Sequence, residues 1–108
     1  MATEFLTLDE RNHGDHIRLA VGDHLSISLA GNPTTGYEWA LMAVDDALLK
    51  LQAGPDYFLQ REVPGGGGRF VFQLEALATG VTLLELVYRR AFLPGEVAKR
   101  FNLTVEIK

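Results

Sequence analysis

Apolar and polar residues alternate along several stretches of this chain. A period of two places every apolar side chain on one face of an extended strand, which packs against the core. The segment 81–88 differs, because it carries apolar residues on both faces, as expected of a strand in the middle of a sheet. The clearest alternating stretches are 25–30, 37–41, 70–75 and 100–107.

Weaker strand patterns occupy four further segments, and no window shows the apolar stripe of a helix. Residues 45–51 fit one short helical turn at most. Many short strands separated by turn residues predict an all-β fold, an antiparallel β-sandwich of about seven to eight strands. The chain has no internal repeat or linker, so we expect residues 1–108 to form a single domain. The weaker strand segments are 5–8, 16–20, 48–52 and 57–61.

The composition sets limits on the chemistry. With 108 residues, of which 47% are hydrophobic and 22% charged, the chain resembles an ordinary globular domain. A domain of this size buries about two-thirds of its unfolded surface and needs no metal or disulfide for stability. There are no cysteines, which excludes a thiol nucleophile and a zinc-thiolate site. We expect no cofactor.

Charge and hydropathy bear on partners and location. The net charge is -4, from 10 basic and 14 acidic residues, which argues against a broad nucleic-acid-binding surface. No run of about 18 apolar residues occurs, so we expect no membrane span. The first residues lack the features of a signal peptide. We therefore expect a cytoplasmic location, or a periplasmic or secreted one if a leader has been removed.

Three connections between the predicted strands have unusual composition: 31–36, 62–68 and 89–96. Successive antiparallel strands place alternate connections at the same end of a sandwich. If the chain crosses the sandwich once between residues 43 and 62, these three loops share one end and the turn 78–80 lies at the other. An additional full-length strand within 48–61 would reverse this arrangement for one loop. Loops gathered at one end of a rigid scaffold form a binding surface.

The first connection combines stiff and permissive residues. Pro33 fixes its own φ and restricts Asn32, while Gly36 permits a positive φ where the loop ends. Thr34 and Thr35 are small and β-branched, so docking them on a partner costs little side-chain entropy. An ordinary hairpin turn with suitable turn residues is the alternative interpretation.

The other two connections also admit two interpretations. The glycine run 65–68 is no phosphate-binding loop, because no Gly-Lys-Ser/Thr follows it; it is either a flexible tether or backbone that lies close against another protein. Arg90 and Phe92 belong to residue types that are enriched at interface hot spots. An aromatic residue beside a loop can equally cap the protein's own core.

Taken in order, these loops resemble the three motifs of the chagasin family of cysteine-peptidase inhibitors, namely Asn-Pro-Thr-Thr-Gly-aromatic, Gly-x-Gly-Gly and Arg-Pro-Trp or Arg-Pro-Phe. The resemblance extends over nearly the whole chain, including its length and strand pattern. The third motif departs from the family in one position, where alanine replaces proline. The matching residues are Asn32, Pro33, Thr34, Thr35, Gly36 and Tyr37, then Gly65, Gly66, Gly67 and Gly68, then Arg90, Ala91 and Phe92.

The resemblance implies an immunoglobulin-like sandwich that acts as a reversible, competitive inhibitor of papain-like cysteine peptidases, without cofactor or enzymatic activity. Thr34, with Thr35, would cover the catalytic cysteine of the peptidase. The glycine run would lie along one side of the V-shaped cleft, and Arg90 with Phe92 would press on the other. We expect the free protein to be a monomer.

Two other classes of function remain open at this point. A hydrolase is disfavoured because Ser26 and Ser28 lie in a strand and not in a Gly-x-Ser-x-Gly elbow. The histidines at positions 13, 16 and 24 could share a metal with nearby aspartates, but we expect them to be separate, exposed residues. The stronger alternative is an immunoglobulin-like binding or adhesion module for another protein or a carbohydrate.

Overall fold

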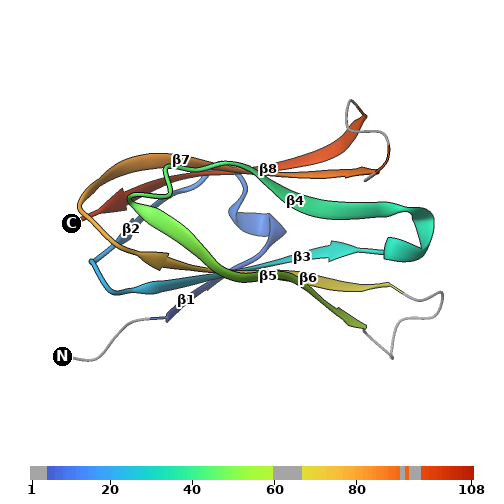
Figure 1. Ribbon diagram of the computed structural model, residues 1–108, viewed down its shortest axis with the longest axis horizontal. Coiled ribbons are helices and arrows are strands. Elements are labelled where there is room, and N and C mark those ends of the chain that lie inside the picture. The colour runs from blue at the N-terminus through green and yellow to red at the C-terminus, as the bar shows by residue number, and fades with distance from the viewer. Residues whose placement is uncertain (1–4, 60–66, 91, 93–95) are drawn as a thin grey trace.

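The computed structural model describes residues 5–59, 67–90, 92 and 96–108, which form a sandwich of two β-sheets (Figure 1). The described residues contain eight strands and two short 3-10 helices, so the all-β prediction is confirmed. The strands are β1 (Phe5–Leu8), β2 (His16–Leu19), β3 (His24–Gly31), β4 (Tyr37–Ala43), β5 (Leu49–Leu59), β6 (Gly68–Ala76), β7 (Gly80–Arg90) and β8 (Val97–Ile107); the 3-10 helices are η1 (Glu10–Asn12) and η2 (Pro33–Thr35).

Each sheet has four strands. The first sheet has the order β1-β3-β6-β5, and the second has the order β2-β8-β7-β4. The pairs within β3–β8 are antiparallel, as the sequence predicts. The two N-terminal strands depart from that prediction, because β1 lies parallel to β3 and β2 lies parallel to β8. Alternation along a strand identifies its buried face but carries no information about the direction of its neighbour.

The two weak segments 48–52 and 57–61 belong to one strand. β5 runs from Leu49 to Leu59 against β6, and its register is irregular between Leu51 and Asp56. Residues 60 and 61 lie outside the described part of the chain. The short turn expected within 45–51 is present at its start, where the Asp45 carbonyl accepts hydrogen bonds from the N–H groups of Leu48 and Leu49. Residues 49–51 belong to β5. The chain therefore crosses the sandwich once between β4 and the glycine run, as the arrangement of the three loops requires.

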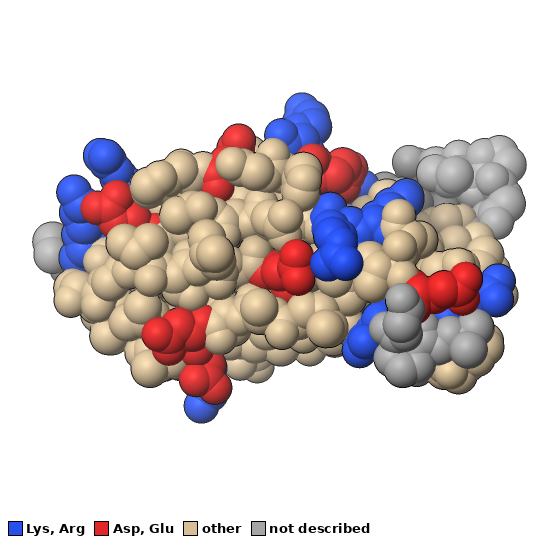
Figure 2. Space-filling model, turned by 90° about the horizontal axis from the view of Figure 1, so that it is seen from above, with Lys and Arg blue, Asp and Glu red and all other residues tan. Residues whose placement is uncertain are grey.

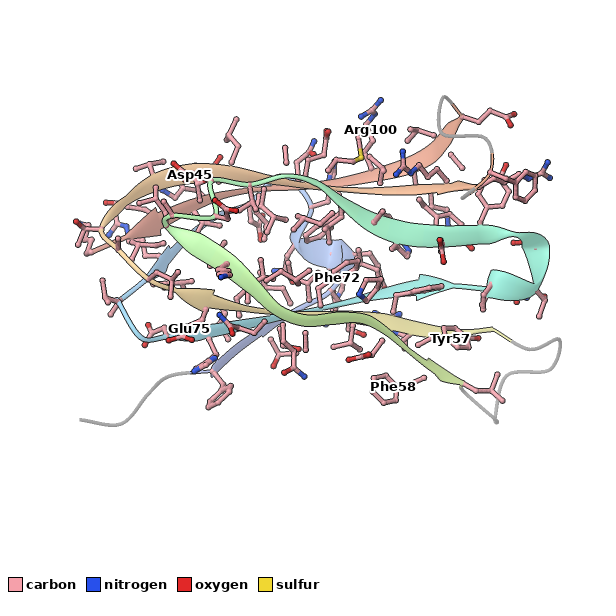
Figure 3. All side chains as sticks on the ribbon, viewed as in Figure 1. Asp45, Tyr57, Phe58, Phe72, Glu75 and Arg100 are labelled. Carbon is pink, nitrogen blue, oxygen red and sulfur yellow. The ribbon has the colours of Figure 1, made fainter. Side chains whose placement is uncertain are left out.

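The core lies between the two sheets and contains the inward-facing side chains of the alternating stretches. Phe72 of the first sheet is fully buried there (Figure 3). Phe101 and Leu86 of the second sheet are fully buried as well. Trp39 is 4% exposed, which confirms that the alternation in 37–41 points this ring inward. Because these side chains pack closely between the two sheets, the sandwich is a rigid scaffold for the loops at its end.

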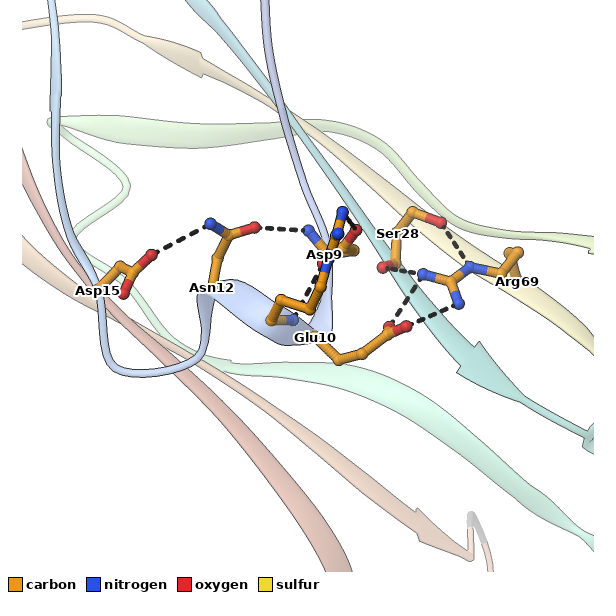
Figure 4. A network of polar contacts seen from close by, with 7 residues as sticks. Asp9, Glu10, Asn12, Asp15, Ser28 and Arg69 are labelled. Carbon is orange, nitrogen blue, oxygen red and sulfur yellow. Dashed lines mark hydrogen bonds and ion pairs between the residues drawn. The ribbon is translucent and has the colours of Figure 1, made fainter.

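The 3-10 helix η1 is fastened to the first sheet by a polar network (Figure 4). The guanidinium of Arg69 donates two hydrogen bonds to the carboxylate of Glu10, at 3.0 and 2.9 Å, and two more to the hydroxyl and carbonyl of Ser28. These hydrogen bonds lower the pKa of the Glu10 carboxyl below its ordinary value. The network holds the N-terminal segment against strands β3 and β6.

Candidate functional site

The strand ends that border the three predicted loops lie at one end of the sandwich. Gly31, the last residue of β3, pairs with Gly68, the first residue of β6. Tyr37, the first residue of β4, pairs with Arg90, the last residue of β7. The first loop, the described end of the glycine run and the third loop therefore share one end, opposite the turn that joins β6 to β7 (Figure 1). We call this end the rim; its described members are residues 31–37, Gly67, Gly68, Arg90 and Phe92.

The first loop is a capped 3-10 turn. The side-chain Oδ1 of Asn32 accepts hydrogen bonds from the N–H of Thr34 at 3.1 Å and from its hydroxyl at 2.7 Å. The carbonyl of Asn32 accepts a hydrogen bond from the Thr35 hydroxyl at 2.7 Å. Gly36 ends the turn with φ 85°, and its N–H donates to the carbonyl of Pro33 at 3.0 Å. A positive φ is strained for residues with a side chain, so glycine suits this position.

This loop connects the two sheets and is not a hairpin, because β3 belongs to the first sheet and β4 to the second. Thr34 and Thr35 are both exposed at its tip. Their hydroxyl hydrogens are donated within the loop. Each threonine therefore offers a partner a methyl group and an oxygen that can accept, but not donate, a hydrogen bond. The tip is small, apolar in part and already ordered.

A cluster of aromatic rings packs together between the first loop and the core. The ring of Tyr88 lies 5.3 Å from that of Tyr37 and 5.2 Å from that of Trp39, measured between centroids. The guanidinium carbon of Arg90 lies 5.1 Å from the centroid of the Tyr37 ring. The indole N–H of Trp39 donates to the carbonyl of Ala30 at 2.9 Å. Tyr37, which the motif places in the binding loop, is only partly exposed and belongs to this aromatic cluster.

The two described glycines of the second loop have different surroundings. Gly68 is buried, and a Cβ atom there would overlap the carbonyl oxygen of Phe58 and come within 2.6 Å of the Tyr57 ring. A Cβ atom at Gly67 would meet nothing within 4 Å. Gly68 is therefore required by packing within the protein, and Gly67 is the one that is open to a partner. Gly65 and Gly66 lie outside the described residues.

The third loop contributes Arg90 and Phe92, while Ala91 lies outside the described residues. Phe92 is 70% exposed, so it does not cap the core. Its ring approaches the backbone of Gly36, where a Cβ atom would lie 3.4 Å from the ring edge. The Nε of Arg90 is buried and has no hydrogen-bond partner within the described part of the chain. The first and third loops are thus in contact, through Phe92 on Gly36 and Arg90 on Tyr37.

Basic and acidic residues are nearly balanced on the outer face of the second sheet near the third loop. Viewed onto the second sheet, basic groups gather in the half nearer the rim, with acidic groups among them (Figure 2). Arg100 pairs with Glu85 at 3.4 Å, and Arg89 lies opposite Glu38 in the β4–β7 register. This balance gives the face no strong preference for an acidic partner. The described charged residues here are Arg89, Arg90, Lys99 and Arg100, with Glu38, Glu85 and Glu96.

Sequence reasoning missed residues that lie at or below the rim. Phe58 and Leu59, at the end of β5, are each 58% exposed beside the glycine run. Tyr88 is 8% exposed, and its hydroxyl accepts a hydrogen bond from the N–H of Asn32 at 3.0 Å. The apolar run 81–88 predicts a strand in the middle of a sheet, with Tyr88 among its buried residues, and nothing in the pattern indicates the partner of its hydroxyl.

The three histidines considered as metal ligands have separate partners. The ring of His13 accepts a hydrogen bond from the N–H of Asn102, and His16 lies 3.3 Å from Glu106. His24 stacks on Phe5. The described residues contain no group of three side chains that could hold a metal ion. Among them, too, no helix is long and apolar enough to cross a membrane.

The rigid sandwich with its ordered first loop has the architecture of a binding module that presents loops from one end. Residues 18–105 match the family model described as "Chagasin family peptidase inhibitor I42". The chain therefore belongs to the chagasin family of peptidase inhibitors, as its three loop motifs indicate. The non-enzymatic class follows from the family as well.

Relatives agree with this assignment. Amoebiasin-1 of Entamoeba histolytica is 32% identical over 106 residues, covering 95% of this chain and all of the relative. The cysteine protease inhibitor EhICP2, also from Entamoeba histolytica, has the same fold, with a TM-score of 0.81 at 22% identity over 98% of this chain and 97% of its own. PbICP-C, solved in complex with falcipain-2, superposes with a TM-score of 0.63 at 21% identity, covering 98% of this chain and 91% of its own.

Proposed function

We propose that this protein inhibits papain-like cysteine peptidases reversibly, by inserting its rim into the active-site cleft. Membership of a peptidase-inhibitor family supports the proposal. The structural relative PbICP-C, which was solved with falcipain-2, supports the choice of target class. The observation that carries the mechanism is the preformed arch of Asn32, Thr34 and Thr35, which stands between the glycine run and the third loop.

In this mechanism the arch covers the catalytic cysteine. The N–H of Thr35 donates to the carbonyl of Asn32 at 3.2 Å, so the Thr34–Thr35 peptide bond belongs to a closed turn. A nucleophile needs a scissile carbonyl held in line for attack at about 3–3.5 Å, a geometry that an extended substrate offers and a closed turn does not. The inhibitor therefore occupies the cleft without being cleaved.

The two sides of the rim extend the contact. Gly67 brings backbone without a side chain to one wall of the cleft, and Phe92 brings an exposed ring to the other. Interfaces of standard size bury about 1,600 Å² in total, and their affinity depends on how little must be ordered on binding. Hydrogen bonds within the first loop and its contact with Phe92 order the rim beforehand, which favours tight binding.

A pair of threonine-to-arginine variants tests the proposal. Thr34→Arg places a long charged side chain at the tip of the arch, whereas Thr79→Arg makes the same change at an exposed turn at the opposite end. Both variants should melt like the parent, because exposed side chains contribute little to stability. We expect Thr34→Arg to raise the inhibition constant against papain by about a hundredfold or more, the equivalent of about 2.7 kcal/mol, and Thr79→Arg to leave it unchanged.

Equal inhibition by the two variants would remove the arch from the mechanism. A parent protein that inhibits no papain-like peptidase at micromolar concentration would refute the proposed function as a whole and favour a binding module of another kind. Binding to a peptidase whose cysteine is blocked by a small reagent provides a further check. It should persist, because no bond to the cysteine is required, and it should weaken if the adduct fills the space of Thr34.

A further inference from the structure

The hydroxyl of Tyr88 connects the second sheet to the tip of the first loop. Tyr88 lies near the rim end of β7, and its hydroxyl accepts the hydrogen bond from the N–H of Asn32 at 3.0 Å. Asn32 follows β3 of the first sheet. The bond therefore spans the two sheets at the point where the inhibitory loop begins.

From Asn32 the hydrogen bonds continue to both threonines. Its side-chain oxygen accepts hydrogen bonds from the N–H and hydroxyl of Thr34, and its carbonyl accepts them from the N–H and hydroxyl of Thr35. A shift of the Asn32 backbone would therefore move the groups that accept hydrogen bonds from both threonines. Because Asn32 is the N-cap of the 3-10 turn, its position decides where the turn stands above the sandwich.

The Tyr88 ring has little freedom of its own. Tyr37 and Trp39 pack against it, and the Lys99 ammonium lies 5.6 Å from its centroid. A Cβ atom at Gly31 would come within 3.1 Å of the ring edge, so the backbone of β3 also passes close by. A ring held on these sides gives its hydroxyl a defined position.

We propose that Tyr88 is a positioning residue for inhibition, which sets the height and orientation of the Thr34–Thr35 tip through Asn32. The inference rests on the proposed function. At 8% exposure the side chain is too buried to form a substantial contact with a peptidase, so its effect passes through the loop. β7 leads from Tyr88 to Arg90 within two residues, so the same residue also fixes the first loop relative to the third.

Thr82 offers a matched control on the same strand. It is 6% exposed, and its hydroxyl accepts a hydrogen bond from the N–H of Asp45 at 2.9 Å, at the end of the sandwich opposite the rim. Tyr88→Phe and Thr82→Val each remove one hydroxyl that receives a backbone N–H and leave a side chain of similar shape. The Thr82 hydroxyl also donates to the carbonyl of Leu83 at 3.0 Å, so we expect Thr82→Val to lose at least as much thermal stability as Tyr88→Phe.

Only Tyr88→Phe should weaken inhibition. The expected rise in the inhibition constant is about 3- to 10-fold, which corresponds to the net free energy that one such hydrogen bond contributes. Amide hydrogen exchange at Asn32 should become faster in Tyr88→Phe and stay unchanged in Thr82→Val.

Two results would overturn the inference while the parent still inhibits: unchanged inhibition by Tyr88→Phe, or equal weakening of inhibition by Thr82→Val. Loss of inhibition in Thr34→Arg beside unchanged inhibition in Tyr88→Phe would refute the positioning role alone. A parent without inhibitory activity would refute the proposed function, on which the inference depends.

Discussion

Alanine substitution of the two neighbouring glycines should separate folding from inhibition. The motif treats Gly67 and Gly68 alike, but their surroundings differ. At Gly68 a Cβ atom would overlap the Phe58 carbonyl oxygen and approach the Tyr57 ring to 2.6 Å. Phe58 belongs to β5 and pairs with β6, so its backbone cannot move away without disturbing that pairing. At Gly67 the added atom would enter open space, and no positive φ is required.

The cost at Gly68 can be worked out from these contacts. Adding a methyl group to a tightly packed site typically costs about 1–3 kcal/mol. For 108 residues the entropy of unfolding is about 0.23 kcal/mol/K, so each 1 kcal/mol lowers the melting temperature by about 4 °C. We therefore expect Gly68→Ala to melt about 4–13 °C below the parent. Gly67→Ala should melt at the parent temperature or slightly above it, because it loses less chain entropy on folding.

Inhibition should show the reverse pattern. Below its melting temperature Gly68→Ala should inhibit papain within about threefold of the parent, since its methyl group points into the protein. Gly67→Ala should inhibit about tenfold less well, because its methyl group stands between the rim and the cleft wall. Thermal melts followed by circular dichroism and titration of papain activity at 25 °C measure both quantities. A Gly68→Ala variant as stable as the parent would refute the packing argument, and a Gly67→Ala variant with full activity would remove Gly67 from the interface.

Two further variants test the scaffold. Trp39→Ala should lower the free energy of unfolding by about 3–5 kcal/mol in a chemical denaturation experiment, because it empties a buried site and removes the hydrogen bond to the Ala30 carbonyl; a loss below 1 kcal/mol would contradict the burial. Glu10→Gln weakens the contact with Arg69 and should cost about 0–1 kcal/mol at pH 7, as is typical of partly exposed ion pairs. Because the pKa of the folded Glu10 is lowered, its stabilisation is present above the ordinary carboxyl pKa and is lost as the pH falls through the lowered value. Melting curves of parent and Glu10→Gln should therefore converge as the pH falls, and a gap that does not narrow in acid would contradict this.

Local patterns in the sequence were sufficient to predict most of the strands, their buried faces and the first loop, although two predicted segments proved to be the single strand β5. Alternation identified the strand that contains Trp39 and the direction of its ring. Turn chemistry identified the loop of Asn32, Pro33 and Gly36, and the structure adds the 3-10 conformation and the cap. These features depend on neighbours within a few residues along the chain, which a single sequence displays directly.

The tertiary structure decided which residues of the motifs face outward and which hold the rim together. Gly68 is enclosed by Tyr57 and Phe58, although its neighbour Gly67 is open. Tyr88 reads as a core residue in the strand pattern, yet its hydroxyl meets Asn32 at a distance of 56 positions along the chain. The parallel pairing of β1 and β2 was equally absent from the pattern. A period of two records only which face of a strand is buried, whereas pairing and cross-sheet contacts arise when distant segments pack, so they are determined in space.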